Sequence, residues 1–333
     1  RLDLLLPQIT QAEAGQATVD DLLRIVYFAV AYQIDCPRHG AYTTPMSLDI
    51  NLTTSRSILT RTSGFLATVT SHSLQPYRGC TYGNSLCGVG CYVRHNGLLT
   101  RGQQWGSFLD IRTNAADLYR SHVGRERRWA QAQRQGFSIF MSSSTDPYVP
   151  QERRHRITRG LLGAMVAEPP DELIVQTHSH LITDDVPLLR ELAPQCRLRV
   201  HLSIESDQQD LPGLPPPASS IEHRFAAANT LRRAGVRVVI TVSPLLPIRD
   251  AESFFARIAA AADAVVIDHF IGGDGSPDGR RTARTSLPAA MAQLEPASVT
   301  LNYRDAIVDV ACRHLPGNVG VSIDGFAGRF LPA

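Results

Sequence analysis

Three cysteines stand close together in a glycine-rich stretch, residues 77–96, whose residue types suit metal binding. They are Cys80, Cys87 and Cys91, with glycines at positions 79, 83, 88 and 90. Glycine lets a backbone fold tightly around a ligand, and soft thiolates select zinc, copper(I) or iron-sulfur clusters. Structural zinc sites and iron-sulfur clusters normally take four protein ligands. Three thiolates therefore predict a metal centre with one coordination position open for a substrate.

Two plainer interpretations of the cysteines exist. The three could simply pack, because free cysteine is among the most buried residue types, but packing does not explain four glycines in so short a stretch. A zinc site could instead be closed by a fourth ligand such as His95. Three further cysteines stand alone and are expected to be ordinary buried residues, namely Cys36, Cys196 and Cys312.

The balance of charged residues excludes several classes of function. The 333-residue chain has 33 basic and 31 acidic residues, a net charge of +2, so no global field favours nucleic acid or membrane. Every basic residue is arginine. The absence of lysine excludes Schiff-base chemistry and a P-loop.

Cysteine usage and the apolar runs bear on the compartment. Six cysteines in a chain of this length, three of them clustered, favour a reducing compartment over a disulfide framework. The longest early apolar run, residues 25–32, is too short to cross a bilayer, and we see no signal peptide. We therefore expect a cytoplasmic protein without a membrane partner.

The chain that must position the cysteines alternates between strand and helix patterns. An alternating segment, Leu66, Thr68 and Thr70, predicts a strand that leads to the cysteine loop. Further predicted strands are 137–141, 172–177, 198–204, 236–242 and 264–270, and predicted helices are 114–135, 156–167, 186–192 and 219–234, the last capped by Ser219 with Glu222. This alternation favours a parallel sheet, open or closed into a barrel, with the chemistry after the strands.

The pattern divides the chain into three parts. Residues 1–58 carry a helical pattern, clearest at 19–32, and are expected to form an N-terminal helical extension. Residues 59–272 form the main barrel unit, and residues 273–333 complete or cover it. The glycine-rich loop 272–281 is equally compatible with a mobile lid and with a linker.

The predicted helix 114–135 is rich in arginine. Its basic residues are Arg120, Arg125, Arg127, Arg128 and Arg134. They could hold phosphates, but a charge-rich helix face is more often solvated, and we favour that interpretation.

Several stretches together resemble the radical S-adenosylmethionine (SAM) superfamily, and within it the spore photoproduct lyase-like branch. The likeness rests on the cysteine loop, on residues 56–65 and 105–114, and on Ser144-Thr-Asp-Pro-Tyr148 followed by Thr158-Arg159. Weaker likeness continues at 203–205, 234–238, 243–247 and 320–326. The match spans residues 55–270, so it covers the predicted main unit.

The resemblance implies an α/β fold, a partial TIM barrel of about six parallel β/α units with an N-terminal helical extension. It implies a [4Fe-4S] cluster held by Cys80, Cys87 and Cys91, whose open iron binds the amino and carboxylate groups of SAM. Reductive cleavage of SAM would yield a 5'-deoxyadenosyl radical that abstracts hydrogen from an organic substrate. A flavodoxin- or ferredoxin-type reductant would supply the electron. The enzyme could then be a lyase, an oxidoreductase or a transferase.

The same resemblance assigns residues around SAM. The implied set is Tyr92, Ser142, Ser143, Asp146, His178, Ser203 and Glu205. Tyr92 occupies the place of an aromatic residue beside the adenine. The turn 142–146 would meet the methionine amino group, because hydroxyls and a carboxylate accept from an ammonium. The end of strand 198–204 would reach the ribose and carboxylate, and His178 takes a place where relatives often have a basic residue.

Two departures from the family bear on the reaction. Six and three residues separate the cysteines here, in place of the usual three and two, so the loop must be remodelled. No cysteine lies within residues 138–144, where photoproduct lyases keep a hydrogen-donating thiol. We therefore favour a small molecule over nucleic acid as substrate. Repair of DNA photoproducts, with a basic groove near residues 120–134, and a non-catalytic zinc-binding protein remain the alternatives.

Overall fold

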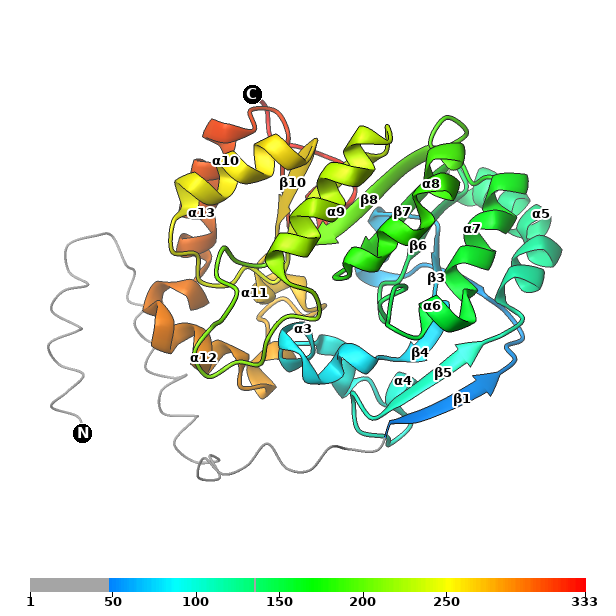
Figure 1. Cartoon of the computed structure of the whole chain (residues 1–333), viewed down its shortest axis with the longest axis horizontal. Coiled ribbons are helices and arrows are strands. Elements are labelled where there is room, and N and C mark those ends of the chain that lie inside the picture. Colours follow the sequence, from blue (N-terminus) through cyan, green and yellow to red (C-terminus); the bar gives the residue numbers. More distant parts are fainter. Residues whose placement is uncertain (1–47, 135) are drawn as a thin grey trace, which may run out of the picture.

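The core of the protein is a large, mostly parallel sheet. The computed structural model describes residues 48–134 and 136–333 (Figure 1). Within them eight strands lie in the order β11-β10-β9-β8-β7-β6-β3-β2, with β2 antiparallel to β3 and every other neighbouring pair parallel. The strands are β2 (Leu59–Arg61), β3 (His72–Leu74), β6 (Ser138–Met141), β7 (Glu172–Thr177), β8 (Arg197–Ser203), β9 (Arg237–Val242), β10 (Ala264–Ile267) and β11 (Val319–Val321).

Helices that connect the parallel strands cover the outer face of this sheet (Figure 1). They are α5 (Ala115–Arg134), α7 (Ile157–Ala167), α8 (Val186–Leu192), α9 (Ile221–Arg233), α10 (Ala251–Ala261) and α13 (Leu301–His314). Alternate strand residues such as Val175, Val200 and Ile240 point outward and pack against them in one apolar core. The predicted alternation of strands and helices is confirmed, and the bounds of most elements agree within one residue.

The inner face of the sheet has an apolar layer with a polar layer above it. Phe140, Ile174 and Val266 point inward and form a cluster with Phe326 of α14 (Ser322–Phe326). Because successive side chains of a strand alternate between faces, the residues two positions later point inward again. These residues are Ser142, Gln176 and Asp268, and they end the inner face at the carboxyl ends of the strands.

A second, smaller sheet carries the cysteine loop. It has the order β1-β5-β4, with strands β1 (Asp49–Thr53), β4 (Tyr77–Gly79) and β5 (Phe108–Arg112). The predicted strand at 66–70 is wrong, because Gly64–Thr68 is a 3-10 helix and the loop follows β4. The described end of the predicted helical extension contains β1 instead of a helix, whereas the helix predicted at 19–32 and Cys36 lie outside the described residues.

Shorter helices surround the ends of the strands. They are α3 (Leu86–Val89), α4 (Gly97–Thr100), α6 (Glu152–His155), α11 (Phe270–Gly273) and α12 (Leu287–Leu294). The predicted strand 264–270 ends at Ile267, because Phe270 already begins α11. The predicted cap of α9 is also wrong. Ser220, not Ser219, accepts the hydrogen bond from the His223 N–H. Among the described residues no helix is both long and apolar enough to span a membrane.

Candidate functional site

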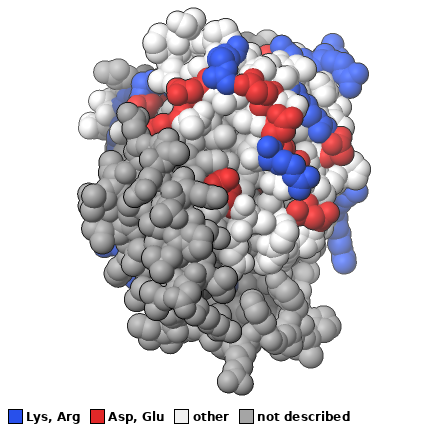
Figure 2. Space-filling model, turned by 90° about the vertical axis from the view of Figure 1, so that its left-hand side faces the viewer, with Lys and Arg blue, Asp and Glu red and all other residues white. Residues whose placement is uncertain are grey.

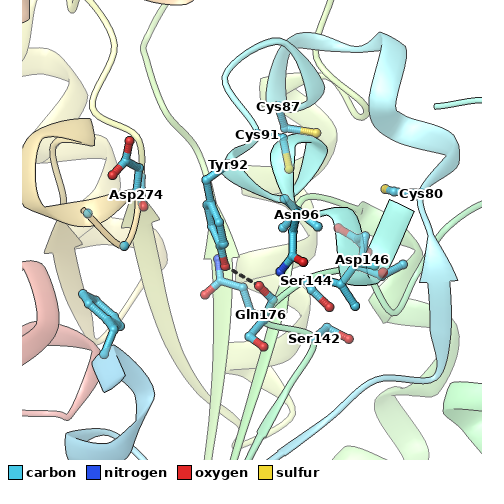
Figure 3. A pocket seen from close by; sticks show the side chains of 18 of the residues that line it. Cys80, Cys87, Cys91, Tyr92, Asn96, Ser142, Ser144, Asp146, Gln176 and Asp274 are labelled. Carbon is cyan, nitrogen blue, oxygen red and sulfur yellow. Dashed lines mark hydrogen bonds between the residues drawn. The ribbon is translucent and has the colours of Figure 1, made fainter. Parts of the chain in front are cut away.

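A cavity of about 560 Å³ opens at the carboxyl ends of the parallel strands. Its lining combines the three clustered cysteines with polar residues from the ends of β6, β7 and β10 and with the loop after α11. Figure 3 shows the cysteines on one side of this space and Asp274 on the other, with Tyr92 and Gln176 between them. The carboxyl end of a parallel sheet is where α/β folds place their chemistry.

Glycines give the cysteine loop its tight course, as the sequence predicts. Gly79 ends β4 at a φ of +82°, a conformation that side-chain-bearing residues rarely adopt. Gly88 lies so close to Gly83 that an added Cβ would be 2.1 Å from the Gly83 carbonyl oxygen. The loop is also tied to the body of the protein by the Leu86 N–H, which donates to the Pro216 carbonyl at 3.0 Å.

The three thiols turn toward a common space inside the cavity (Figure 3). Burial raises the pKa of all three thiols, and neighbouring charges also act to raise the pKa of Cys80 and Cys87; together these effects bring the pKa of Cys80 to about 12. Buried thiolates therefore need a cationic partner, and a metal centre deprotonates its thiol ligands. The donor set is thus suited to a thiolate-bound metal group.

The spacing of the cysteines bears on the kind of group. Among the described residues, no three His, Cys, Asp or Glu side chains converge closely enough to hold a single metal ion. An iron-sulfur cluster binds each cysteine through a different iron, so its ligands stand farther apart than those of one zinc ion. His95, the fourth ligand considered for zinc, is exposed and does not line the cavity.

Tyr92 joins the cysteine loop to the turn after β6. Its hydroxyl donates a hydrogen bond to the backbone carbonyl of Ser143. In the same turn Ser142 adopts a φ of +75°, and its buried Oγ has no hydrogen-bond partner in the described chain. Gln75, which follows β3, donates from Nε2 to the Ser143 Oγ at 2.8 Å. The turn therefore presents one free hydroxyl to the cavity on a backbone held from two sides.

The carboxylate of Asp146 is occupied by its own chain. Oδ1 accepts from the Tyr148 N–H and the Thr177 hydroxyl, both at 2.8 Å. Oδ2 accepts from the His178 N–H at 2.7 Å. Asp146 lines the cavity, but its contacts show that it also fixes the chain after β7.

His178 stands between two carboxylates at the end of β7. Its Nε2 lies 3.2 Å from Glu205 and its Nδ1 lies 3.5 Å from Asp146. Glu205 is buried and pairs with Arg224 at 2.7 Å. Burial acts to raise the pKa of Glu205, but Arg224 and His178 outweigh it and hold the pKa below the ordinary value. This arrangement orients the imidazole toward the cavity.

Ser203 and Glu205 lie behind the cavity wall. Both are buried and neither lines the cavity. The Ser203 hydroxyl accepts from Gln176 Nε2 at 2.7 Å, and Glu205 contacts His178. The structure therefore brings Tyr92, Ser142, Ser143, Asp146 and His178 together, and it places the two β8 residues where they position Gln176 and His178.

Gln176 and Asp268 are among the lining residues that sequence reasoning missed. Gln176 is the penultimate residue of β7 and lies two positions before His178. Asp268 directly follows β10. The sequence feature that could have identified both residues is a polar residue within an apolar strand or directly after it. Such a residue points into the barrel only if the alternation of side chains puts it there, which requires the exact strand bounds.

The glycine-rich loop 272–281 packs beside the cavity. Gly273, Asp274, Gly275 and Arg281 line it. Asp274 is buried, and its carboxylate accepts from the backbone N–H groups of Ser276 and Thr282. Of the two interpretations left open, a segment that covers the site is thus supported over a separate linker.

The solitary cysteines and the arginines of α5 lie outside the cavity. Cys196 and Cys312 are half-buried thiols that do not line it. On α5, Arg120 pairs with Asp117 at 3.0 Å and Arg127 donates to the Pro169 carbonyl. This helix contributes no residue to the cavity lining. Figure 2 shows a different face of the molecule, on which described arginine and acidic side chains lie interspersed.

Curated relatives cover part of this chain. No protein-family model matches it. An uncharacterised protein of Mycobacterium tuberculosis is 26% identical over 200 residues, which span 58% of this chain and 54% of that protein. An uncharacterised protein of Methanocaldococcus jannaschii is 27% identical over 176 residues, which span 52% of this chain and 60% of that protein. The chain thus spans about half the length of the curated relatives it matches.

Solved structures of spore photoproduct lyase resemble this chain over most of its length. One, with bound AdoMet and dinucleoside spore photoproduct, has a TM-score of 0.55 at 11% identity and covers 82% of this chain and 81% of that one. Both structures are of mutant lyases, and the second has a TM-score of 0.56 at 10% identity and covers 90% of this chain and 93% of that one. The chain therefore has the α/β fold of spore photoproduct lyase, which confirms at the level of the fold the resemblance seen in its sequence.

Proposed function

We propose that this protein is a radical SAM enzyme. A [4Fe-4S] cluster would be held by Cys80, Cys87 and Cys91, and SAM would lie in the cavity beside it. The observation that carries the proposal is that three thiols and the polar ends of parallel strands open into the same cavity. When bound, the cluster supplies the electron for reductive cleavage of SAM to a 5'-deoxyadenosyl radical, which abstracts hydrogen from an organic substrate.

The chain's own groups suit the binding of SAM. The free Oγ of Ser142 can accept from the methionine ammonium, and Tyr92 can lie against the adenine. The carboxylate of Asp146, which lines the cavity, favours the positive sulfonium and ammonium of the cofactor. Ser203 and Glu205 act here through Gln176 and His178, because neither reaches the cavity itself.

A small organic molecule is the substrate that we favour. A cavity of about 560 Å³ that must also hold SAM leaves room for a compact second ligand. Each cleavage needs one electron, so a flavodoxin- or ferredoxin-type reductant is the expected partner. Repair of a DNA photoproduct is a second candidate, favoured only by the shared fold. Among the described residues, the cysteines that line the cavity are the three assigned to the cluster.

The test is formation of 5'-deoxyadenosine. The protein would be reconstituted anaerobically with iron and sulfide, mixed with dithionite and SAM, and assayed by chromatography. We expect wild-type protein to form the product and Cys87→Ala to lose it, because Cys87 is a cluster ligand in the proposal. Cys196→Ala is the matched control, since its thiol lies outside the cavity, and it should keep wild-type activity.

Two results would overturn the proposal. One is wild-type protein that assembles no cluster and binds zinc instead. The other is deoxyadenosine formation that survives in Cys87→Ala at the level of Cys196→Ala.

A further inference from the structure

The residue that follows β10 forms part of a cavity wall to which neither the cluster nor SAM has been assigned. Asp268 lines this wall and is 4% exposed. Val266, two residues earlier on the same inward face, packs with Phe140 and Phe326. Asp268 therefore stands one layer above an apolar, partly aromatic floor.

The Asp268 carboxylate is held in place without being neutralised. Oδ1 accepts from the Ser322 hydroxyl at 2.9 Å and Oδ2 from the Ser243 hydroxyl at 3.2 Å. Within the described chain the Asp268 carboxylate forms no salt bridge. The charges of Arg304 and Asp274 affect its pKa only from a distance, and Arg304 pairs with Asp305 instead. A carboxylate offers about four lone-pair sites, so about two remain available to a ligand.

The Asp268 carboxylate occupies space that a side chain at position 273 would fill, and residue 273 is a glycine. A Cβ on Gly273 would lie 2.4 Å from Oδ2 and 2.6 Å from Oδ1 of Asp268. Any larger residue would displace the carboxylate. The loop after α11 is thus shaped to the present position of Asp268.

Gln176, which lines the cavity beside this wall, has an unpartnered acceptor. Gln176 donates from Nε2 to Ser203 and Thr241, and its buried Oε1 has no partner in the described chain. A carboxylate and an amide oxygen together favour a ligand that carries hydrogen-bond donors.

We infer that the substrate of the proposed radical reaction is an amine with an apolar or aromatic body, whose ammonium group binds Asp268. The inference rests on the proposed function for the cysteine side of the cavity. An ammonium has three donors and no acceptor, which suits Asp268 and Gln176. It also compensates a buried carboxylate that has no cationic partner among the described residues. The apolar body would rest on Phe140 and Phe326.

Calorimetric titration tests this assignment with two probes of nearly equal shape, 2-phenylethylamine and 2-phenylethanol. The reconstituted full chain would be titrated near neutral pH without reductant. We expect wild-type protein to bind the amine about tenfold to a hundredfold more tightly than the alcohol, because a charged hydrogen bond is lost with the alcohol. Asp268→Asn should remove this preference and retain alcohol binding.

Two further variants sharpen the test. Gly273→Ala keeps every charge but crowds the carboxylate, so it should also reduce the preference. Asp117→Asn, at a side chain that is 83% exposed on α5, should behave as wild type.

No binding of the amine, equal affinity for both probes, or a preference that survives in Asp268→Asn would each overturn the inference. Should both cavity variants fail to fold, the wild-type preference alone decides. Deoxyadenosine formation is not part of the readout, so failure here is distinguishable from failure of the proposed function.

Discussion

At the scale of residues, the turn after β6 contains two polar residues, Ser142 and Asp146, whose hydrogen bonding differs. Asp146 and Ser142 lie four positions apart and both line the cavity. The Asp146 carboxylate accepts three hydrogen bonds from its own chain, whereas the Ser142 hydroxyl accepts none. Asp146 therefore has a structural role in the described chain, whereas the Ser142 hydroxyl is free, and we propose that it contacts SAM.

This difference predicts opposite effects of two substitutions. Asp146→Asn places an NH₂ group where an oxygen now meets the backbone N–H groups, and it should lower the free energy of unfolding by about 1–3 kcal/mol. Ser142→Ala should change that free energy by less than about 0.5 kcal/mol and weaken SAM binding. Urea unfolding and equilibrium dialysis of SAM measure the two effects. An Asp146→Asn protein as stable as wild type would contradict the structural role.

At the scale of elements, the cysteine loop depends on close approach of its own backbone. Gly88 lies against Gly83, and the loop is carried by β4 in the small sheet, not by a strand of the large one. The position of the three thiols is therefore set by glycines within the loop and by the pairing of β4 with β5.

Gly88→Ala tests this dependence. A methyl group would lie 2.1 Å from the Gly83 carbonyl oxygen, so the loop must shift. We expect the iron bound per chain after reconstitution to fall to a small fraction of the wild-type value. Gly97→Ala is the matched control, because no atom lies within 4 Å of its added Cβ. Full iron loading of Gly88→Ala would show that the loop tolerates another course.

At the scale of the whole molecule, α5 clamps the edge of the large sheet through one carboxylate. Glu126 accepts from Arg61 of β2 at 2.8 Å and lies 3.2 Å from His72 of β3. Burial acts to raise its pKa, but hydrogen bonds from Arg61, Arg125 and His72 outweigh burial and lower the pKa to about 2. β3 leads directly to Gln75 and β4, so this clamp supports the approach to the site.

The lowered pKa predicts a defined pH dependence of stability. A carboxylate whose folded pKa lies below its unfolded pKa stabilises the fold above the unfolded value and loses this contribution as the pH falls. The difference in unfolding free energy between wild type and Glu126→Gln should be largest above pH 4.5 and shrink toward pH 2. Urea unfolding across this range measures it, with Glu191→Gln at an exposed position of α8 as control. A difference that does not vary with pH would contradict the assignment.

The sequence by itself determined the parallel α/β architecture and the cysteine stretch that we propose binds a metal group. Both rest on local signals: apolar runs with turn residues set strands such as β7 and β8, and three cysteines among glycines lie within twelve residues of each other. The cysteine loop remained recognisable because its chemistry is contained in one continuous stretch.

Only the tertiary structure decided which polar residues face the cavity. Ser203 and Gln176 both lie at strand ends, yet Gln176 lines the cavity and Ser203 is buried behind it. Asp268 meets Ser322, which is 54 positions away in the chain. Such contacts depend on the order and register of strands and on which side chain reaches farther, and these are set by packing between distant segments. The local sequence pattern therefore cannot predict these contacts.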